Sequence, residues 1–361
     1  MKRKILSVAM LSVALISSMM IVSCKKDDSV FTQEVTGSSK TAAKVSAVSG
    51  EVVSSGSSWI SSVNGVQVYS GTDYGDAINA AINNLTPGRT TKEWVYVRNS
   101  GNAGPSGDAV RGVVLQSNTG LDFTGTTFNA TDQDLLTVPV RADNKSNIEV
   151  KNLHVIGYPR YGIWFRGCSN IILTNITMDL QSPGLGIGIR VDNTTGKSSN
   201  LAINGTLDFV GGEHGIETLG VTGITISDIS VSRNRGCGVL LNKSSKATIG
   251  TVTGNYNNNG GGYATFRVAN DNGPEITVTK VYSRNSGRGF FSVSGSGGTT
   301  IGTVDIASST DGNILLQDAD NTYINGGTSV ASNNVRNIQH YNTRRCVTKV
   351  NGQTYTGDGI W

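Results

Sequence analysis

The feature that most constrains the fold of this chain is a short strand-like segment that recurs between residues 162 and 318. Within each segment apolar residues alternate with other residues, as in Gly162-Ile-Trp-Phe-Arg, which is typical of a β-strand with one buried face. The segments begin at Gly162, Gly188, Gly215, Gly238, Tyr263, Phe290 and Asn313. Such a chain is expected to repeat one structural unit many times.

The interval between these strands is nearly constant. Their first inward residues, which we call anchors, are separated by 26, 27, 23, 25, 27 and 23 residues. The anchors are Ile163, Ile189, Ile216, Val239, Ala264, Phe291 and Ile314. Val140 and Val113 extend the series toward the N-terminus at a similar interval, so the pattern predicts nine rungs.

Two further strands fit within each period. A residue that tolerates a left-handed backbone follows most anchors by seven positions, at Gly120, Asn147, Asn170, Gly223, Gly298 and Asn321. A third apolar pair then follows, at Leu153/Val155, Ile176/Met178, Leu207/Phe209, Ile229/Val231 and Val304/Ile306. Three strands and three turns in about two dozen residues describe one coil of a parallel β-helix.

Stacking explains why such a coil must repeat. One coil cannot bury its inner face alone, whereas stacked coils place like residues on each other at about 4.8 Å along the axis. A propeller blade would need roughly 40 or more residues, and no helical period lies between the strands. We therefore predict an all-β fold, a single-stranded parallel β-helix of about nine or more coils.

The two ends of the β-helix are expected to be capped. Apolar residues at helical spacing, from Ile78 to Leu85, follow Thr72-Asp73 and stop at Pro87-Gly88. This predicts a short helix over residues 72–86 that covers the first coil. The β-helix domain is expected over residues 58–340, and residues 341–361, which lose the register, are expected to form the closing cap.

The N-terminus carries a targeting pattern. Lys2, Arg3 and Lys4 precede an apolar run that ends at Ser23-Cys24. This resembles a bacterial lipoprotein signal peptide over residues 1–23, with Cys24 as the lipidated residue. The alternative is a transmembrane anchor. Cleavage would remove three positive charges and no negative charge, so the net charge would fall from +4 to +1.

The residues after Cys24 imply a location. Lys25-Lys26-Asp27-Asp28 resembles the surface-export signal of Bacteroidetes lipoproteins, which implies an outer membrane lipoprotein exposed at the cell surface. The membrane would then be a partner through the lipid on Cys24. Residues 24–57 are rich in Ser, Thr and Gly and are expected to be a flexible tether.

The net charge and the cysteine spacing exclude two classes of partner, nucleic acids and cysteine-bound metals. The small net charge gives no basic field for a nucleic acid, so we expect no nucleic-acid binding. Cys168, Cys237 and Cys346 remain once Cys24 is set aside, and their spacing is not that of a metal site. We expect a monomer.

Candidate functional residues gather on the outer face of the first strand of each coil. Arginines, carboxylates, amides and aromatic residues point outward there or lie just before it, at Arg141, Asp143, Tyr161, Trp164, Arg166, Arg190, Asp192, Glu213, His214, Glu217, Asn242, Tyr263, Arg267 and Arg288. Localised mixed charge favours a functional groove. The simpler interpretation is pairing of charges across neighbouring strands, for example Arg190 with Glu217.

The coil count, the helical cap, the Asn/Gly turns and the lipoprotein leader together resemble the pectate-lyase superfold. This resemblance covers residues 58–340 and implies a right-handed β-helix of the kind found in polysaccharide lyases and polygalacturonase-like hydrolases. Gly212-Glu213-His214-Gly215 is similar to the Gly-His-Gly segment of polygalacturonases, but Glu213 replaces its first glycine. The other polygalacturonase segments are not found in matching order.

The arginines favour an anionic polysaccharide and, slightly, a lyase that cleaves it by β-elimination. In that reaction a cation neutralises the uronate carboxylate and a base removes the adjacent proton. Arg166, Arg190 and Arg267 would form the cationic clamp, and His214, oriented by Glu217, would be the base. Candidate catalytic residues are His214, Glu217, Asp192, Arg190 and Arg267, and candidate substrate-binding residues are Arg141, Trp164, Arg166, Asn242, Tyr263 and Arg288. Calcium on Asp143, Asp192 and Glu217 would be the cofactor if a metal shares the neutralising role.

Two other functions fit the same face. An inverting glycoside hydrolase needs two carboxylates about 6.5–9.5 Å apart, and strand geometry places Asp192 and Glu217 roughly 8 Å apart. A glycan-binding or adhesive β-helix without catalysis would use Tyr161, Trp164 and Tyr263 to stack on sugar rings.

Overall fold

The computed structural model describes residues 47–104, 111–181 and 186–361. The predicted signal peptide, Cys24 and most of the predicted tether lie outside these residues. In the described part of the chain, no helix is long and apolar enough to cross a membrane.

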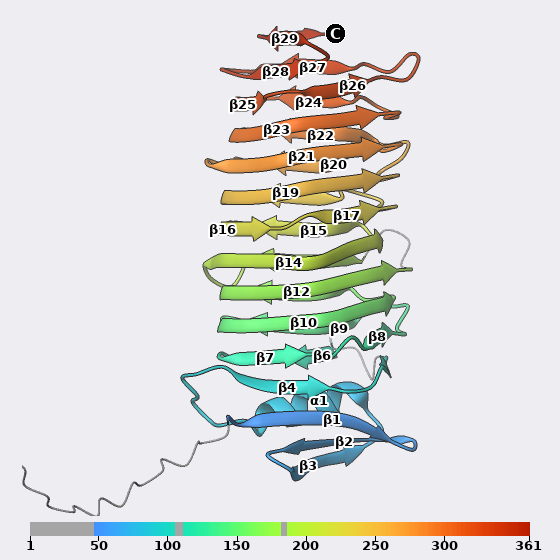
Figure 1. The fold of residues 1–361 in the computed structure, drawn as a ribbon, viewed down its shortest axis with the longest axis vertical. Helices are drawn as coiled ribbons and strands as arrows, with labels where there is room; N and C mark the ends of the chain where they lie inside the picture. Colours follow the sequence, from blue (N-terminus) through green and yellow to red (C-terminus); the bar gives the residue numbers. More distant parts are fainter. Residues whose placement is uncertain (1–46, 105–110, 182–185) are drawn as a thin grey trace, which may run out of the picture. The chain divides into compact units, whose positions relative to one another are not determined.

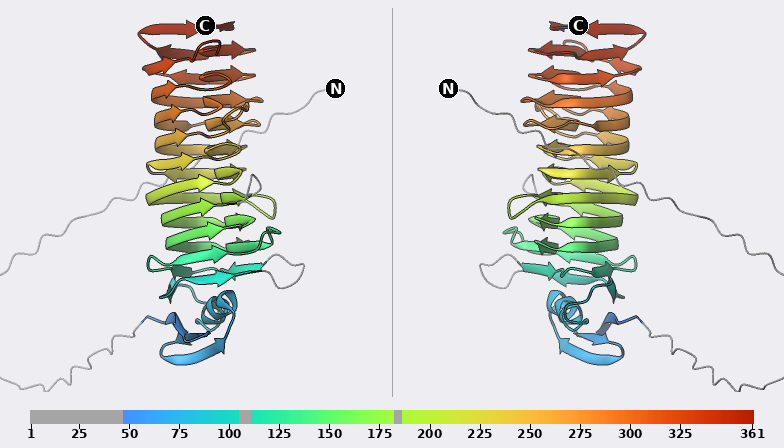
Figure 2. Two further views of the ribbon diagram at one scale, coloured as in Figure 1. Left: turned by 90° about the vertical axis from the view of Figure 1, so that its right-hand side faces the viewer. Right: turned by 90° about the vertical axis from the view of Figure 1, so that its left-hand side faces the viewer.

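One side of each coil belongs to an eleven-stranded sheet (Figures 1 and 2). Its first ten strands pair in parallel, each with the strand of the next coil, and the last pairs antiparallel. The strands are, in spatial order, β6 (Arg111–Val114), β9 (Thr137–Asp143), β11 (Tyr161–Arg166), β13 (Ile187–Asp192), β15 (His214–Leu219), β18 (Val239–Asn242), β20 (Ala264–Ala269), β22 (Arg288–Val293), β24 (Ile314–Gln317), β27 (Ile338–Tyr341) and β30 (Gly359–Ile360).

The remaining strands form a nineteen-stranded sheet that supplies the other walls of the coils. They are β1 (Ser49–Ser55), β2 (Ser58–Val63), β3 (Val66–Gly71), β4 (Glu93–Val97), β5 (Gly101–Ala103), β7 (Thr119–Asp122), β8 (Thr127–Ala130), β10 (Ser146–Gly157), β12 (Ser169–Leu180), β14 (Ser198–Gly211), β16 (Val221–Ile226), β17 (Ile229–Ser232), β19 (Ser245–Asn255), β21 (Ile276–Arg284), β23 (Gly297–Ala307), β25 (Asp320–Ile324), β26 (Gly327–Val330), β28 (Val347–Val350) and β29 (Gln353–Thr356). The predicted second and third strands often run together, and Asn152 in β10 and Asn175 in β12 have a left-handed backbone (φ 56° and 55°) partway along these long strands.

The predicted parallel β-helix is confirmed. The anchors from Val113 to Val239 pair in the expected register and are buried, as are the predicted third-strand pairs. Two predicted anchors are wrong, because Val239 pairs with Phe266 rather than Ala264, and Phe266 pairs with Phe290 rather than Phe291. The rings of Phe266 and Phe290 stack inside the helix with centroids 5.6 Å apart. A tenth rung follows at Ile338.

The predicted column of left-handed residues is largely confirmed. Asn147, Asn170, Gly223, Gly298 and Asn321 all have positive φ. In the first coil the residue is Asn118 (φ 56°) rather than Gly120, and the Asn147 side-chain amide donates to Asn118 Oδ1 at 2.7 Å. Asparagine suits these turns because its amide bonds to the equivalent residue one coil away.

Both ends of the stack are closed (Figure 1), but the predicted C-terminal cap begins too early, because β28 still pairs in parallel with β25. Helix α1 (Tyr74–Asn83) lies within the predicted range and buries its apolar residues against the first coil, and Asp73 caps its N-terminus. Strand β1 shows that the predicted tether ends too late, because Ser49–Ser55 pairs with β2 and β4 and buries Val52. At the other end β28 and β29 form an antiparallel hairpin.

Candidate functional site

The predicted site residues lie on the outer face of the eleven-stranded sheet. Pairing of β9, β11, β13, β15, β18, β20 and β22 places one outward column in the order Arg141, Trp164, Arg190, Glu217, Leu240, Arg267 and Phe291. A second outward column contains Asp143, Arg166, Asp192, Leu219 and Asn242. Residues far apart in sequence, from Arg141 to Arg267, are therefore brought to one wall, as predicted.

Arg190 links the two central carboxylates of this wall. Its Nη1 donates to Glu217 Oε2 on the next strand, and its Nε donates to Asp192 Oδ2 at 3.2 Å. Burial by itself lowers the pKa of Arg190, but the charges of Glu217 and Asp192 outweigh burial and raise it. The cross-strand pairing of Arg190 with Glu217, considered above as the simpler interpretation, is confirmed.

Asp192 has little remaining capacity to act on a substrate. Oδ2 also accepts Trp164 Nε1–H at 3.0 Å, while Oδ1 accepts the backbone N–H of Thr194 at 3.0 Å and its hydroxyl. Burial raises the pKa of Asp192, but these bonds and the charge of Arg190 together lower it. The carboxylate is 2% exposed and stays ionised.

Arg166 is paired in the same way. It donates to both oxygens of Asp143, with 2.8 Å between Nη2 and Oδ2, and its guanidinium lies 4.2 Å from the centre of the Trp164 ring. The hydrogen bond with Asp143 raises the pKa of Arg166 despite its partial burial. Tyr161 completes this group, because its ring centre lies 4.7 Å from that of Trp164.

The three carboxylates predicted to hold calcium do not form such a site. Asp143 binds Arg166, whereas Asp192 and Glu217 bind Arg190. Within residues 47–104, 111–181 and 186–361, no group of three or more His, Cys, Asp or Glu side chains could hold a metal ion. The residues present therefore do not fit calcium, because arginines occupy the positions that a cation would take.

His214 is held in one neutral form. Its Nδ1 accepts the backbone N–H of Cys237 at 2.8 Å, so the ring proton must lie on Nε2. Burial lowers the pKa of His214, and the positive charges of Arg267 and Arg190 act in the same direction, outweighing Glu217. His214 therefore presents a donor rather than the free lone pair that the predicted base needs.

Arg267 differs from the paired arginines. Its guanidinium lies 4.6 Å from the centre of the Tyr263 ring and 5.0 Å from that of Phe291. Among the residues that the structure describes, no carboxylate lies within ion-pair distance of Arg267, and its buried Nε has no hydrogen-bond partner. A positive charge on an aromatic platform, without a counter-ion, is available for an anionic ligand.

A smaller apolar patch, separate from the main core, includes Leu240 and Phe291, which flank Arg267 in the outward column. Its residues are buried and are Cys237, Leu240, Ala264, Ala269, Phe291, Val293 and Leu315. Burial raises the pKa of Cys237 to about 11, so this thiol is protonated and packs as an apolar residue. Cys168 and Cys346 are also buried free thiols.

Among the other predicted substrate-binding residues, Arg141 has no ion-pair partner in the described residues, whereas Arg288 and Asn242 already bond to neighbouring groups. Arg141 has a buried Nε without a hydrogen-bond partner in the described part of the chain, and no ion pair forms there. Arg288 pairs with Asp311 and donates to the carbonyl of Gly262. The Asn242 amide donates weakly to Glu217 Oε1, at 3.5 Å.

Sequence reasoning missed one residue of this face. Because the predicted register was one residue off, Phe291 was expected inside the β-helix. It lies on the outer face, where its ring contacts the guanidinium groups of Arg267 and Arg288. Glu213, which the sequence placed beside His214, has a raised pKa, because burial and repulsion by Glu217 outweigh the charge of Arg235. The pattern of large aromatics after Gly289 could not distinguish the two faces, because two adjacent phenylalanines satisfy either register.

Residues 138–306 match the family model described as the right handed beta helix region. The described domain is a right-handed parallel β-helix. This β-helix is consistent with the resemblance to the pectate-lyase-like superfold. No curated protein sequence matches the chain.

Two solved structures of the surface protein and adhesin PfbA from Streptococcus pneumoniae are similar to the β-helix. The first is 14% identical with a TM-score of 0.41, covering 76% of this chain and 94% of that chain. The second is 12% identical with a TM-score of 0.34, covering 80% and 92%. A likeness at this level supports no inference about what this chain binds.

Proposed function

We propose that the β-helix binds an acidic, uronic-acid-containing polysaccharide along the outer face of the eleven-stranded sheet. The observation that carries the proposal is Arg267, whose guanidinium lies on Tyr263 and Phe291 without a carboxylate partner in the described residues. Guanidinium and carboxylate match as a bidentate pair, and aromatic faces favour contact with sugar rings.

The rest of the face supports binding of an extended chain. Arg141 is a second arginine without an ion pair in the described part of the chain, and β11, β13, β15 and β18 separate its strand from that of Arg267. At about 4.8 Å per strand, those five steps span roughly 24 Å. Trp164 and Tyr161 lie near the Arg141 end, while Tyr263, which is 39% exposed, lies near the other. Two cationic contacts at this separation suit an oligosaccharide rather than one sugar.

Cleavage of the same polymer by β-elimination is the second candidate. The observation that favours it is the position of the Tyr263 phenol beside Arg267 and 6.3 Å, centre to centre, from the His214 ring. Arg267 would neutralise the uronate carboxylate, and Tyr263, acting as its phenolate, would remove the proton from the adjacent carbon while the bond to the leaving oxygen breaks. The Tyr263 hydroxyl formed in this way would then return the proton to the leaving oxygen. His214 would donate a hydrogen bond through Nε2–H rather than act as the base.

Hydrolysis by Asp192 and Glu217 is less well supported. An inverting hydrolase needs one protonated carboxyl and room for a water between the two groups. Arg190 instead lies between Asp192 and Glu217 and binds both. The lowered pKa of Asp192 also opposes a role as the acid.

We also propose that the protein is an outer membrane lipoprotein, held at the cell surface through a lipid on Cys24. Supporting observations are the basic and apolar residues before Cys24 and the acidic residues after it. Labelling of cells with a fatty-acid analogue should tag the wild-type protein and not Cys24→Ala. Equal labelling of both would contradict the proposal.

The proposed function is tested by titrating the purified protein with polygalacturonate and, as a control, a neutral galactan. We expect binding of the acidic polymer that weakens as salt is raised, and little binding of the neutral one. Equal binding of both polymers, or of neither, would contradict the proposal. Ultraviolet absorbance of an unsaturated product in the same mixture would establish elimination, and its loss in Tyr263→Phe would assign the base.

A further inference from the structure

The outer face of the eleven-stranded sheet is unevenly charged along its length. From β9 to β20 the two outward columns carry, besides Arg141 and Arg267, two arginines and three carboxylates, which are Arg166, Arg190, Asp143, Asp192 and Glu217. Arg166 and Asp143 neutralise each other. The guanidinium of Arg190 therefore has two carboxylates to balance, which leaves one net negative charge on β13 and β15.

This negative charge is fixed in place. Asp192 is 2% exposed and Glu217 is 6% exposed, and both bind Arg190. Asp192 is also held by Trp164, whose Nε1–H donates to it at 3.0 Å. Buried charges are screened less by water and salt than exposed ones. Ser182-Pro183-Gly184-Leu185, which precede β13, carry no charge and leave the count unchanged.

The charge of Glu217 acts on its surroundings even though Arg190 binds it. Burial raises the pKa of Glu213, and repulsion by Glu217 adds to the rise, while Arg235 opposes it. Glu213 and Arg235 balance each other in charge beside the columns. Arg160 lies at the Arg141 end, where its guanidinium is 5.8 Å from the centre of the Tyr161 ring. A carboxylate that approaches β13 or β15 would therefore meet repulsion.

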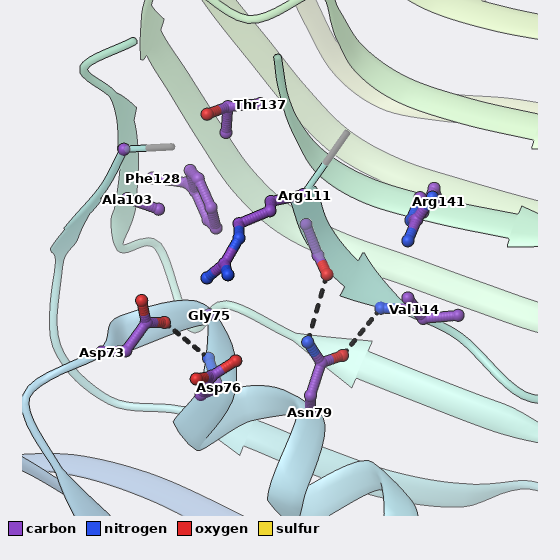
Figure 3. Close-up of a pocket in the computed structure, with 12 residues that line it drawn as sticks. Asp73, Gly75, Asp76, Asn79, Ala103, Arg111, Val114, Phe128, Thr137 and Arg141 are labelled. Atoms are coloured by element: carbon purple, nitrogen blue, oxygen red, sulfur yellow. Dashed lines mark hydrogen bonds between the residues drawn. The ribbon is translucent and has the colours of Figure 1, made fainter. Parts of the chain in front are cut away.

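The spacing of these charges is set by the strand ladder. β13, β15, β18 and β20 pair in parallel, so Glu217 lies two strands from Arg267, which is about 10 Å at 4.8 Å per strand. At the N-terminal end Asn79 ties α1 to β6, because its amide donates to the Gly112 carbonyl at 3.1 Å and its Oδ1 accepts the Val114 N–H at 2.8 Å (Figure 3). A chain that extends from Arg267 toward Arg141 must pass over the negative charge.

The sugars of such a chain are not equivalent. A uronate at Arg267 meets a guanidinium without a carboxylate partner in the described residues. A uronate over β13 or β15 would place its carboxylate near Asp192 and Glu217, and like charges brought together in an interface oppose binding. A neutral sugar there avoids this repulsion and meets the partly exposed side chains of Trp164 and Leu219.

We propose that the outer face selects an acidic polysaccharide in which neutral sugars separate the uronates. One uronate pairs with Arg267, and the sugars over β13 and β15 are neutral. This inference rests on the proposed function and narrows its class of polymer. General attraction between a basic surface and a polyanion predicts the opposite preference, because affinity would rise with the number of carboxylates.

The test is calorimetric titration of the purified full chain with two sets of oligosaccharides of equal length. One set comes from polygalacturonate, in which every sugar is a uronate, and the other from deacylated gellan, in which neutral sugars separate the glucuronates. We expect the gellan oligosaccharides to bind at least about fivefold more tightly. A smaller ratio, or a preference for the oligogalacturonates, would overturn the proposal.

One variant assigns the preference to the fixed negative charge. Glu217→Gln leaves Asp192 to bind Arg190, so it should raise oligogalacturonate affinity about fivefold or more and gellan affinity by a smaller factor. Damage to the fold would not increase affinity. The matched control is Asp305→Asn, which removes an arginine-paired carboxylate from β23 of the other sheet and should leave the affinity ratio unchanged.

An unchanged preference in Glu217→Gln with an unaltered melting temperature would overturn the proposal, and the wild-type comparison decides if this variant does not fold. If this inference alone fails, both acidic oligosaccharides bind and Arg267→Gln weakens both, but gellan is not preferred. If the proposed function fails, neither binds more tightly than an oligomer of neutral galactan. The two failures are therefore distinguishable.

Discussion

The arginines of the outer face are of two kinds. Arg166 and Arg190 are neutralised by carboxylates on their own or neighbouring strands, which raises the pKa of each. Arg141 and Arg267 have no such partner in the described part of the chain. A ligand along these columns therefore meets arginines without a carboxylate partner at Arg141 and Arg267, and these two residues should contribute most to its recognition.

Substitution of Arg267 should show whether charge or shape matters at this position. We expect Arg267→Gln to weaken polygalacturonate binding about tenfold, the order of one charge-assisted pair. Arg267→Lys keeps the charge but not the planar group that lies on Tyr263 and Phe291, so it should restore only part of the affinity. Both are measured by calorimetric titration, and wild-type affinity in Arg267→Gln would refute the role of this residue.

His214 should make stability depend on pH. Burial lowers its pKa in the folded protein below the ordinary value of 6.5, so the unfolded chain binds a proton at a higher pH than the folded one. The contribution of neutral His214 to the free energy of unfolding is therefore complete above about pH 7. This contribution is lost as the pH falls below 6.5.

His214→Asn tests this coupling, because the asparagine Oδ1 can accept the Cys237 N–H in place of Nδ1. The free energy of unfolding of this variant should fall less than that of the wild type between about pH 7 and 5. The pH dependence of the unfolding free energy should be reduced rather than abolished, since burial also lowers the pKa of His340. Parallel denaturant curves for the two proteins across this range would contradict the assignment.

At the scale of strands, the sequence predicts the repeat well and its register less well. Apolar alternation placed Ile189 and Ile216 correctly, because each lies between a glycine and a charged residue. In β22 two phenylalanines are adjacent, so periodicity could not decide which faces inward. Ion pairing was predicted in part, because strand neighbours suggested Arg190 with Glu217, whereas the pairing of Arg166 with Asp143 depends on side-chain directions that periodicity does not give.

The register of β22 can be tested by two matched substitutions. Phe290 is completely buried in the main core and stacks on Phe266, so Phe290→Ala should cost about 3–5 kcal/mol of unfolding free energy. Phe291→Ala removes a side chain from the smaller outer patch and should cost less than half as much. Urea denaturation measures both, and a larger loss in Phe291→Ala would contradict this register.

For the whole molecule, coil stacking determines where function can lie. Parallel pairing turns a spacing of about two dozen residues into one step between neighbouring strands, so the sequence could predict a shared wall without any motif. The central claim is that one wall, rather than general positive charge, binds the acidic polymer.

A charge-matched pair of double variants tests that claim most directly, by calorimetric titration with polygalacturonate. The first, Arg141→Gln with Arg267→Gln, removes two positive charges from the outer face of the eleven-stranded sheet. The second, Lys246→Gln with Lys280→Gln, removes two from β19 and β21 of the other sheet. We predict that the first loses about a hundredfold in affinity and the second less than threefold. Equal losses in both would contradict the account.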